Sequence, residues 1–324
     1  MNIKKNDVKT LLPINQFNLY GYDKYFNFFV ELIKRKKLPN NLLISGAKGL
    51  GKATFVYHLI NYFLSKNEEN KYQVNDFYIN RKNRSYELLY KNLHPNFFLI
   101  ENNLSEQNIK VDQIRNLLKF LSKSTYKQDY KIVLIDNAEL LNLNSSNALL
   151  KVLEEHQYNT FFFIIHNSSH RISETIKSRC VEFKIFFSRK EKEKILLNLI
   201  EQLKINCDPY KKVNSLSFDT PGNMLNYLTT LNDENFDISE SNLDTIQYLI
   251  NKYILDKSTD TLNYISLFIE KFYNELCSKN SNSLGSYFYN YNKVLKLLNN
   301  MKRFNLNGKN TLITVSDILH NESK

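Results

Sequence analysis

Residues 42–54 read Leu-Leu-Ile-Ser-Gly-Ala-Lys-Gly-Leu-Gly-Lys-Ala-Thr, an apolar run followed by a glycine-rich turn. The run from Leu42 to Ile44 is typical of a buried strand in a parallel sheet. The glycines allow a tight turn whose backbone N–H groups face a phosphate, and Lys52 adds a positive charge beside them. We expect a helix over 53–64 whose positive end points to the same place. The stretch therefore predicts a P-loop.

The spacing Gly-x-x-x-x-Gly-Lys is met between Gly46 and Lys52, but the next residue departs from the usual motif. That position normally gives a hydroxyl to a magnesium ion, and here it is Ala53. Thr54 carries a hydroxyl one residue too late. The pattern therefore favours the P-loop fold more strongly than it favours nucleotide binding.

A second motif residue, Asp136, ends the apolar run 131–136. In P-loop proteins an aspartate at this place holds the magnesium ion, and a glutamate directly after it activates the attacking water. Here the next residue is Asn137, whose amide cannot accept a proton, and Glu139 would have to reach around a turn to replace it. Asp136 also suits a plain strand end. The sequence leaves open whether the loop binds a cofactor at all, and the ligands that would fit it are ATP or ADP with magnesium. The candidate nucleotide-binding residues are Gly46, Gly49, Gly51, Lys52, Ala53, Thr54 and Asp136.

Composition excludes several classes of protein. The three cysteines are far apart and support neither a disulfide framework nor a four-cysteine zinc site, so we expect no metal centre. No secretory signal and no apolar run of membrane-span length is present, so we expect a cytoplasmic location without membrane contact. The formal net charge of +11 suits contact with DNA. It also suits solvated faces, because lysine and asparagine are frequent throughout the chain.

Further elements are expected on both sides of these motifs. Helical spacing of apolar residues occurs within 18–37, 111–123 and 147–155, and strand-like apolar runs occur at 96–101, 160–165 and 181–187. Residues 65–92 are polar and are expected to be irregular. The residues from His166 to Ser169 end a predicted strand with polar groups, which suits either contact with a terminal phosphate or a simple strand-ending turn.

The chain after residue 187 reads as helical. Ser188 and Glu191 form a capping box for one helix and Pro221 begins another, so we expect a small helical lid. Residues 232–239 are polar and acidic, as in a linker, and residues 1–16 are expected to form a short arm. Three more helices, rich in aromatic residues that suit a packed core, are expected at 243–254, 261–277 and 287–304.

These motifs resemble those of the clamp-loader subunits of bacterial DNA polymerase III, a family of the AAA+ class, and most closely the delta-prime type. The matching blocks are His94-Pro95, Val111-Asp112-Gln113-Ile114-Arg115, Lys131 to Asp136, Asn147 to Glu155 and Ser178-Arg179-Cys180. The resemblance implies an α/β P-loop NTPase fold: a parallel sheet with helices on both faces, then a helical lid and an all-α collar that joins subunits. It implies domains at 1–186, 187–236 and 237–324.

The same resemblance implies a role for Arg179. In this family the arginine of the Ser-Arg-Cys motif projects into the ATP site of the neighbouring subunit. A guanidinium suits that task because it stays charged and can fork onto phosphoryl oxygens. The plain alternative for Arg179 is a salt bridge within its own chain.

Three departures from the ATP-hydrolysing subunits of the family point in one direction. Ala53 lacks the hydroxyl for magnesium and Asn137 lacks the basic carboxylate. In addition, Asn223 or Met224 stands where the ATPase subunits carry an arginine that reads the nucleotide. The zinc-binding cysteines that many relatives carry are also missing from 65–92.

We therefore expect a largely non-hydrolysing clamp-loader subunit that supplies Arg179 to a neighbouring ATPase subunit while the sliding clamp is loaded onto primed DNA in DNA replication. The implied partners are ATPase subunits and a delta-like subunit and, through the complex, the sliding clamp and primer–template DNA. One alternative is an ATP-hydrolysing motor subunit of the same complex that uses Glu139 or Glu154 as its base. Another is a stand-alone DNA-binding module.

Overall fold

The structure is a computed structural model of the 324-residue chain. It describes residues 12–102, 108–123, 125, 130–155, 159–205, 219–231, 241–279, 283–304 and 306–322. The predicted linker at 232–239 and residues 1–11 of the predicted arm lie outside these ranges. The chain forms two compact units, Met1–Asn226 and Tyr227–Lys324. The division into three domains at 186 and 236 stays a prediction.

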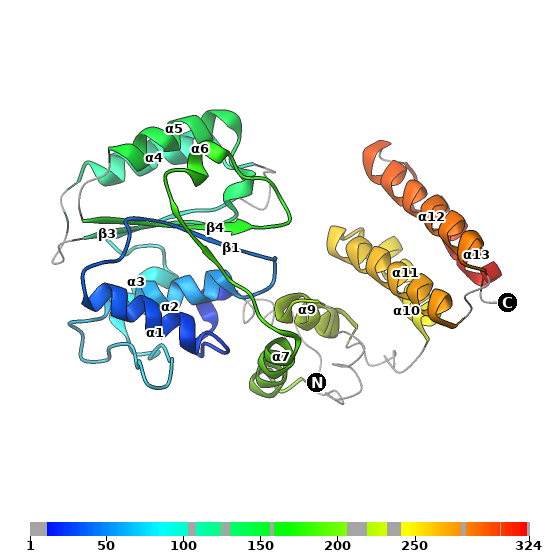
Figure 1. Ribbon diagram of the computed structural model, residues 1–324, viewed down its shortest axis with the longest axis horizontal. Coiled ribbons are helices and arrows are strands. Elements are labelled where there is room, and N and C mark those ends of the chain that lie inside the picture. The colour runs from blue at the N-terminus through cyan, green and yellow to red at the C-terminus, as the bar shows by residue number, and fades with distance from the viewer. Residues whose placement is uncertain are drawn as a thin grey trace. The chain divides into compact units, whose positions relative to one another are not determined.

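Within the described residues, a five-stranded parallel sheet organises the first unit (Figure 1). Its strands lie in the order β2-β3-β4-β1-β5, and every pairing is parallel. Because β1 lies between β4 and β5, the P-loop that follows it leaves the sheet between two neighbouring strands. The predicted α/β fold, a parallel sheet whose first strand leads into a glycine-rich loop, is confirmed. The strands are β1 (Asn41–Gly46), β2 (Phe97–Ile100), β3 (Lys131–Ile135), β4 (Thr160–Asn167) and β5 (Val181–Lys184).

Strand β5 is shorter than predicted. The apolar run predicts a strand over 181–187, but the ladder ends at Lys184, opposite Ser45 of β1. One more bond joins the Ile185 N–H to the Ser45 carbonyl at 2.8 Å. Beyond that point β1 turns away into the P-loop. Phe187 packs instead into the core, with its ring centroid 5.0 Å from that of Tyr22.

Helices cover both faces of the sheet (Figure 1). One face carries α1 (Asp23–Lys34), α2 (Lys52–Leu64) and α3 (Arg84–Tyr90), and the other carries α4 (Val111–Leu121), α5 (Leu143–Glu154) and α6 (Glu174–Lys177). Side chains of β1 alternate between the two cores, with Leu42 and Ile44 on the first face and Leu43 on the second. All three are fully buried. Burial on both faces explains why the strands are continuous apolar runs.

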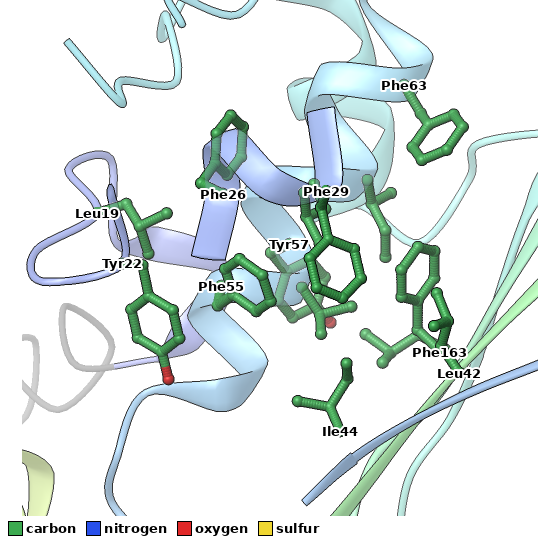
Figure 2. Packing of buried hydrophobic residues seen from close by; sticks show 14 of the residues in the cluster. Leu19, Tyr22, Phe26, Phe29, Leu42, Ile44, Phe55, Tyr57, Phe63 and Phe163 are labelled. Carbon is green, nitrogen blue, oxygen red and sulfur yellow. The ribbon is translucent and has the colours of Figure 1, made fainter. Parts of the chain in front are cut away.

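The core under α1 and α2 is rich in aromatic rings (Figure 2). Tyr22 stacks on Phe55 with ring centroids 4.7 Å apart, and Phe29 meets Phe55 edge to face at 5.5 Å. The hydroxyl of Tyr22 also donates a hydrogen bond to the Leu50 carbonyl at 3.0 Å. These contacts fix the start of α2, and with it the end of the P-loop, against α1.

Residues 84–90 form helix α3, so the prediction that 65–92 is irregular is wrong for these seven residues. Asn83 caps α3 by accepting a hydrogen bond from the Tyr86 N–H at 2.8 Å. The Glu68 carboxylate accepts hydrogen bonds from the first two N–H groups of α3, at 2.9 and 3.0 Å. A seven-residue helix held by polar caps has too few turns to show an apolar period. The segment also buries Tyr72, Ile79 and Leu89.

Two helices follow the sheet in the described residues up to 231, and the second of them crosses the boundary at Asn226 between the two units. Helix α7 (Arg189–Leu203) begins with the predicted capping box of Ser188 and Glu191, and helix α9 (Pro221–Leu231) begins at the predicted proline. Ile195 of α7 belongs to the aromatic core. The start of α9 contacts the P-loop through two hydrogen bonds, described below with the site.

From residue 241 on, the described residues of the second unit form four helices, one more than predicted. They are α10 (Asn242–Asp256), α11 (Thr259–Lys279), α12 (Leu284–Phe304) and α13 (Gly308–Glu322). Helix α13 escaped prediction because it begins with glycine and carries several Thr, Ser and Asp residues of low helix propensity. It is held instead by a buried stripe of Leu312, Val315 and Leu319. Among the helices that the structure describes, none is long and apolar enough to cross a membrane.

Candidate nucleotide site and surface arginine

The carbonyl groups of the P-loop are all bonded within the chain. Each carbonyl oxygen from Gly46 to Gly51 accepts a hydrogen bond, and Tyr22, Lys52 and the start of α9 supply most of the donors. The chain's own donors therefore satisfy these carbonyls, while helix geometry gives the first N–H groups of α2 no partner within the helix, so that they could face an anion. The bonds run from Lys52 Nζ to Gly46 (2.7 Å) and Ala47 (2.7 Å), Thr220 Oγ1 to Lys48 (2.7 Å), Gly222 N to Gly49 (2.8 Å), Tyr22 Oη to Leu50 (3.0 Å) and Phe55 N to Gly51 (2.9 Å).

Glycine is required in the loop for two different reasons. Gly49 and Gly51 have φ angles of +84° and +86°, in the region that favours glycine. At Gly49 there is also no room, since a Cβ atom would lie 2.3 Å from Thr220 Oγ1 and 2.9 Å from Asn223 Oδ1. At Gly46 a Cβ would lie 2.9 Å from the Ile185 carbonyl oxygen. The predicted glycines therefore shape the loop, whatever it binds.

At the loop Lys52 is buried and Asp136 is partly buried. Burial lowers the pKa of Lys52 to about 8, against the opposing effect of the Glu139 and Asp136 carboxylates. Burial likewise raises the pKa of Asp136 to about 6, although a hydrogen bond from the Asn137 N–H at 2.9 Å opposes it. For both groups the loss of water outweighs the attraction between opposite charges.

A cavity of about 430 Å³ opens beside the loop. Six predicted residues line it, whereas Gly46 and Arg179 do not. Asn223 also lines it, while Met224 is fully buried, so of these two residues only Asn223 reaches the cavity. The predicted lining residues are Gly49, Gly51, Lys52, Ala53, Thr54 and Asp136.

Asn167, at the end of β4, also lines the cavity, so one polar residue of the predicted 166–169 group reaches the site. His166 instead bonds the His170 carbonyl at 2.9 Å, which is the behaviour of a strand-ending turn. Tyr22 and Pro221 line the cavity too, and sequence reasoning missed them as site residues. The sequence pointed to this region only through Pro221, which stands at a predicted helix start.

The groups that would hold a metal ion and activate water are poorly represented in this cavity. Ala53 presents a methyl group, and Asn137 presents an amide on a left-handed backbone with φ of 55°. The Glu139 carboxylate accepts a hydrogen bond from the Asn167 N–H at 3.0 Å. In the part of the chain that the structure describes, no three His, Cys, Asp or Glu side chains form a group able to bind a metal.

Arg179 lies apart from this cavity, in the turn between α6 and β5. Its Nε donates to Glu154 Oε1 at 2.6 Å and its Nη1 donates to the Thr175 carbonyl at 2.9 Å, while Nη2 forms an ion pair with the same Glu154 oxygen. The side chain is 34% exposed. The guanidinium is therefore held by its own chain and still reaches the surface.

A family model for the DNA polymerase III delta subunit matches residues 21–188, slightly more than half of the chain. The chain belongs to the DNA polymerase III delta-subunit family. This delta-family chain is 41% identical over 96 residues to a DNA polymerase III delta-prime subunit of Pseudomonas aeruginosa, covering 30% of this chain and 29% of the relative. It is 28% identical over 170 residues to the delta-prime subunit of Buchnera aphidicola subsp. Baizongia pistaciae, covering 51% of this chain and 47% of the relative.

The delta-family chain thus spans less than half the length of these two relatives, and it is delta-prime-like over the part that matches. Among solved structures, it is similar to a DNA polymerase III gamma subunit-related protein of Thermotoga maritima. That likeness has a TM-score of 0.45 and 17% identity, and it covers 91% of this chain and 99% of the other.

Proposed function

We propose that this delta-family chain is a largely non-hydrolysing clamp-loader subunit that supplies Arg179 to the ATP site of a neighbouring subunit. Its partners would be ATPase subunits and a delta-like subunit, with the sliding clamp and primer–template DNA reached through the complex. The observation that carries the proposal is that the candidate arginine lies apart from the chain's own cavity. The chain's own cavity lacks the water-activating groups, while its candidate arginine stands outside that cavity at the surface.

The cavity fits nucleotide phosphates better than it fits nucleotide hydrolysis. The N–H groups at the start of α2 and the Lys52 ammonium are the groups that would hold ATP or ADP. Ala53 offers no oxygen to a magnesium ion, and Asn137 cannot take a proton from water. When bound, a nucleotide would supply negative charge that the N–H groups and Lys52 neutralise, and this chain's residues would only hold it.

The alternative of an ATP-hydrolysing motor subunit needs Glu139 or Glu154 as its base. Glu154 ends α5, pairs with Arg179 and does not line the cavity. Glu139 does not line the cavity either, and its carboxylate accepts the Asn167 N–H. Both contacts argue against this alternative.

Enzyme assays on the single chain and on the assembly test the proposal. We expect no measurable ATP turnover by the purified chain, and turnover by an assembly reconstituted with the ATPase subunits of the same organism. Arg179→Ala should lower turnover of the assembly at least about tenfold, as for an arginine acting in trans, with assembly intact by size-exclusion chromatography. Arg35→Ala is the matched control, because Arg35 is an exposed arginine that also pairs with a glutamate. Turnover by the single chain that Lys52→Ala abolishes would refute the proposal.

A further inference from the structure

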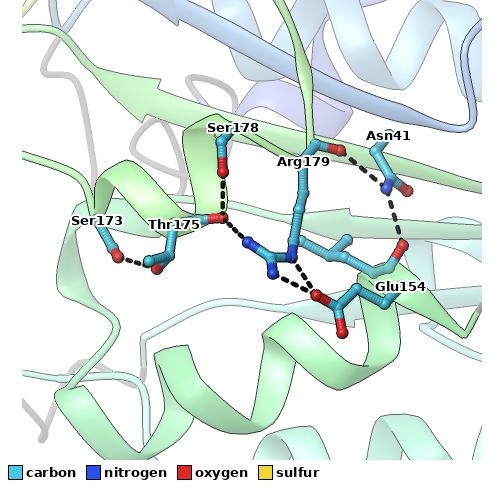
Figure 3. A network of polar contacts seen from close by, with 7 residues as sticks. Asn41, Glu154, Ser173, Thr175, Ser178 and Arg179 are labelled. Atoms are coloured by element: carbon cyan, nitrogen blue, oxygen red, sulfur yellow. Dashed lines mark hydrogen bonds and ion pairs between the residues drawn. The ribbon is translucent and has the colours of Figure 1, made fainter.

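The contacts of Arg179 extend beyond its side chain (Figure 3). Its backbone N–H donates to the Ile176 carbonyl at 3.1 Å, and its carbonyl accepts a hydrogen bond from Asn41 Nδ2 at 3.1 Å. The same Asn41 Nδ2 group donates to the Leu153 carbonyl at 3.1 Å. Asn41 therefore ties the main chain of Arg179 to the end of α5, one residue before Glu154.

Asn41 makes these contacts although one of its own polar atoms is left buried without a hydrogen bond. It is the first residue of β1 and is 9% exposed. Its Oδ1 atom is buried and has no hydrogen-bond partner among the described residues. A buried acceptor without a partner is unfavourable. The position of Asn41 is therefore best explained by what its Nδ2 group holds together.

Glu154 is likewise in an unfavourable place unless it has a partner. It is the last residue of α5, where the negative end of the helix dipole disfavours a carboxylate. Arg179 relieves this repulsion and is in turn held by the carboxylate, which bonds both Nε and Nη2. A guanidinium has five N–H groups. Three take part in contacts with Glu154 and Thr175, which leaves two for an external group such as a phosphoryl oxygen pair.

We infer that Glu154 is a positioning residue for Arg179, with Asn41 fixing the backbone on which both depend. This inference rests on the proposed function. A long arginine side chain loses rotamer freedom when it acts, and a partner that has already restricted it reduces that loss at the moment of reaction. Glu154 and Thr175 hold the guanidinium in one orientation before the neighbour's nucleotide is met.

The test is a double-mutant cycle in the reconstituted assembly. Glu154→Gln keeps the shape of the side chain and removes its charge, so it should lower kcat about two- to fivefold, the size of a half-exposed ion pair, with KM unchanged. In the Arg179→Ala background the same change should have no further effect, because the group that it positions is gone. Glu154→Asp, which restores the charge, should recover part of the loss. Glu155→Gln, one residue further on, is the matched control and should leave turnover unchanged.

Each outcome bears on one claim. A Glu154→Gln loss that persists at full size in the Arg179→Ala background would mean a purely structural role and would overturn the inference. A rise in turnover would also overturn it, since the pair would then restrain the arginine rather than prepare it. If Arg179→Ala itself leaves turnover unchanged, the proposed function fails first. If Arg179→Ala lowers turnover and Glu154→Gln does not, only the positioning role fails.

Discussion

Asp136→Asn should stabilise the first unit at neutral pH. The pKa of Asp136 is raised from 3.8 to about 6. Since the folded-state pKa exceeds the unfolded one, the folded state binds the proton more tightly. Stability is therefore lost as the pH rises from 3.8 to about 6, and the loss persists above that range. A difference of about 2 pKa units corresponds to about 3 kcal/mol at 1.36 kcal/mol per unit.

The net gain in the free energy of unfolding should be smaller than this value of about 3 kcal/mol. Asparagine keeps an oxygen that can accept the Asn137 N–H, but Lys52 loses a nearby opposite charge. We expect Asp136→Asn to raise the free energy of unfolding by about 1–3 kcal/mol at pH 7, or about 2–4 °C in Tm for each kcal/mol in a domain of this size. At pH 4.5 the gain should fall to about a third of its value at pH 7, because Asp136 is then protonated in the folded state.

Thermal and urea unfolding followed by circular dichroism at the two pH values measure both quantities. Asp112→Asn is the control, because Asp112 is 72% exposed and its change should stay within about 0.5 kcal/mol. An Asp136→Asn variant that is no more stable than the parent at pH 7 would refute the reasoning. So would a gain that does not shrink on acidification.

Three further changes test the packing around the site. Gly49→Ala should lower the free energy of unfolding by about 2 kcal/mol or more, because Gly49 has a positive φ and the new Cβ would clash with Thr220. The control is Gly285→Ala in α12, where a Cβ meets open space and should leave the free energy of unfolding unchanged or raise it. Urea unfolding measures both. Glu68→Ala should lower the free energy of unfolding by about 1–2 kcal/mol, because it removes the carboxylate that accepts the first two N–H groups of α3, and it should speed proteolysis near residues 65–92. His58, buried with its pKa lowered to about 3 by loss of water, contributes stability above pH 6.5 that is lost on acidification. His58→Gln should therefore flatten the acid limb of the stability profile.

Much of the first unit could be predicted because its signals are local. The apolar run from Leu42 to Ile44 predicts a strand that is buried on both faces of the sheet. The glycines after it suit the positive φ angles that Gly49 and Gly51 adopt. The second unit was predicted less completely. Its helix α13 has weak propensity and is stabilised by packing, a property that a single sequence window does not contain.

For the candidate site, the sequence alone determined which chemical groups are available: a lysine, one aspartate, an alanine in place of a hydroxyl and an amide in place of a base. Only the tertiary structure decided that Thr220 and Gly222 bond the P-loop carbonyls from about 170 residues away. It alone also paired Arg179 with Glu154, outside the cavity. The physical reason is distance along the chain, since local sequence patterns report backbone preference and burial, whereas partners far apart in sequence are chosen by how the sheet and helices pack.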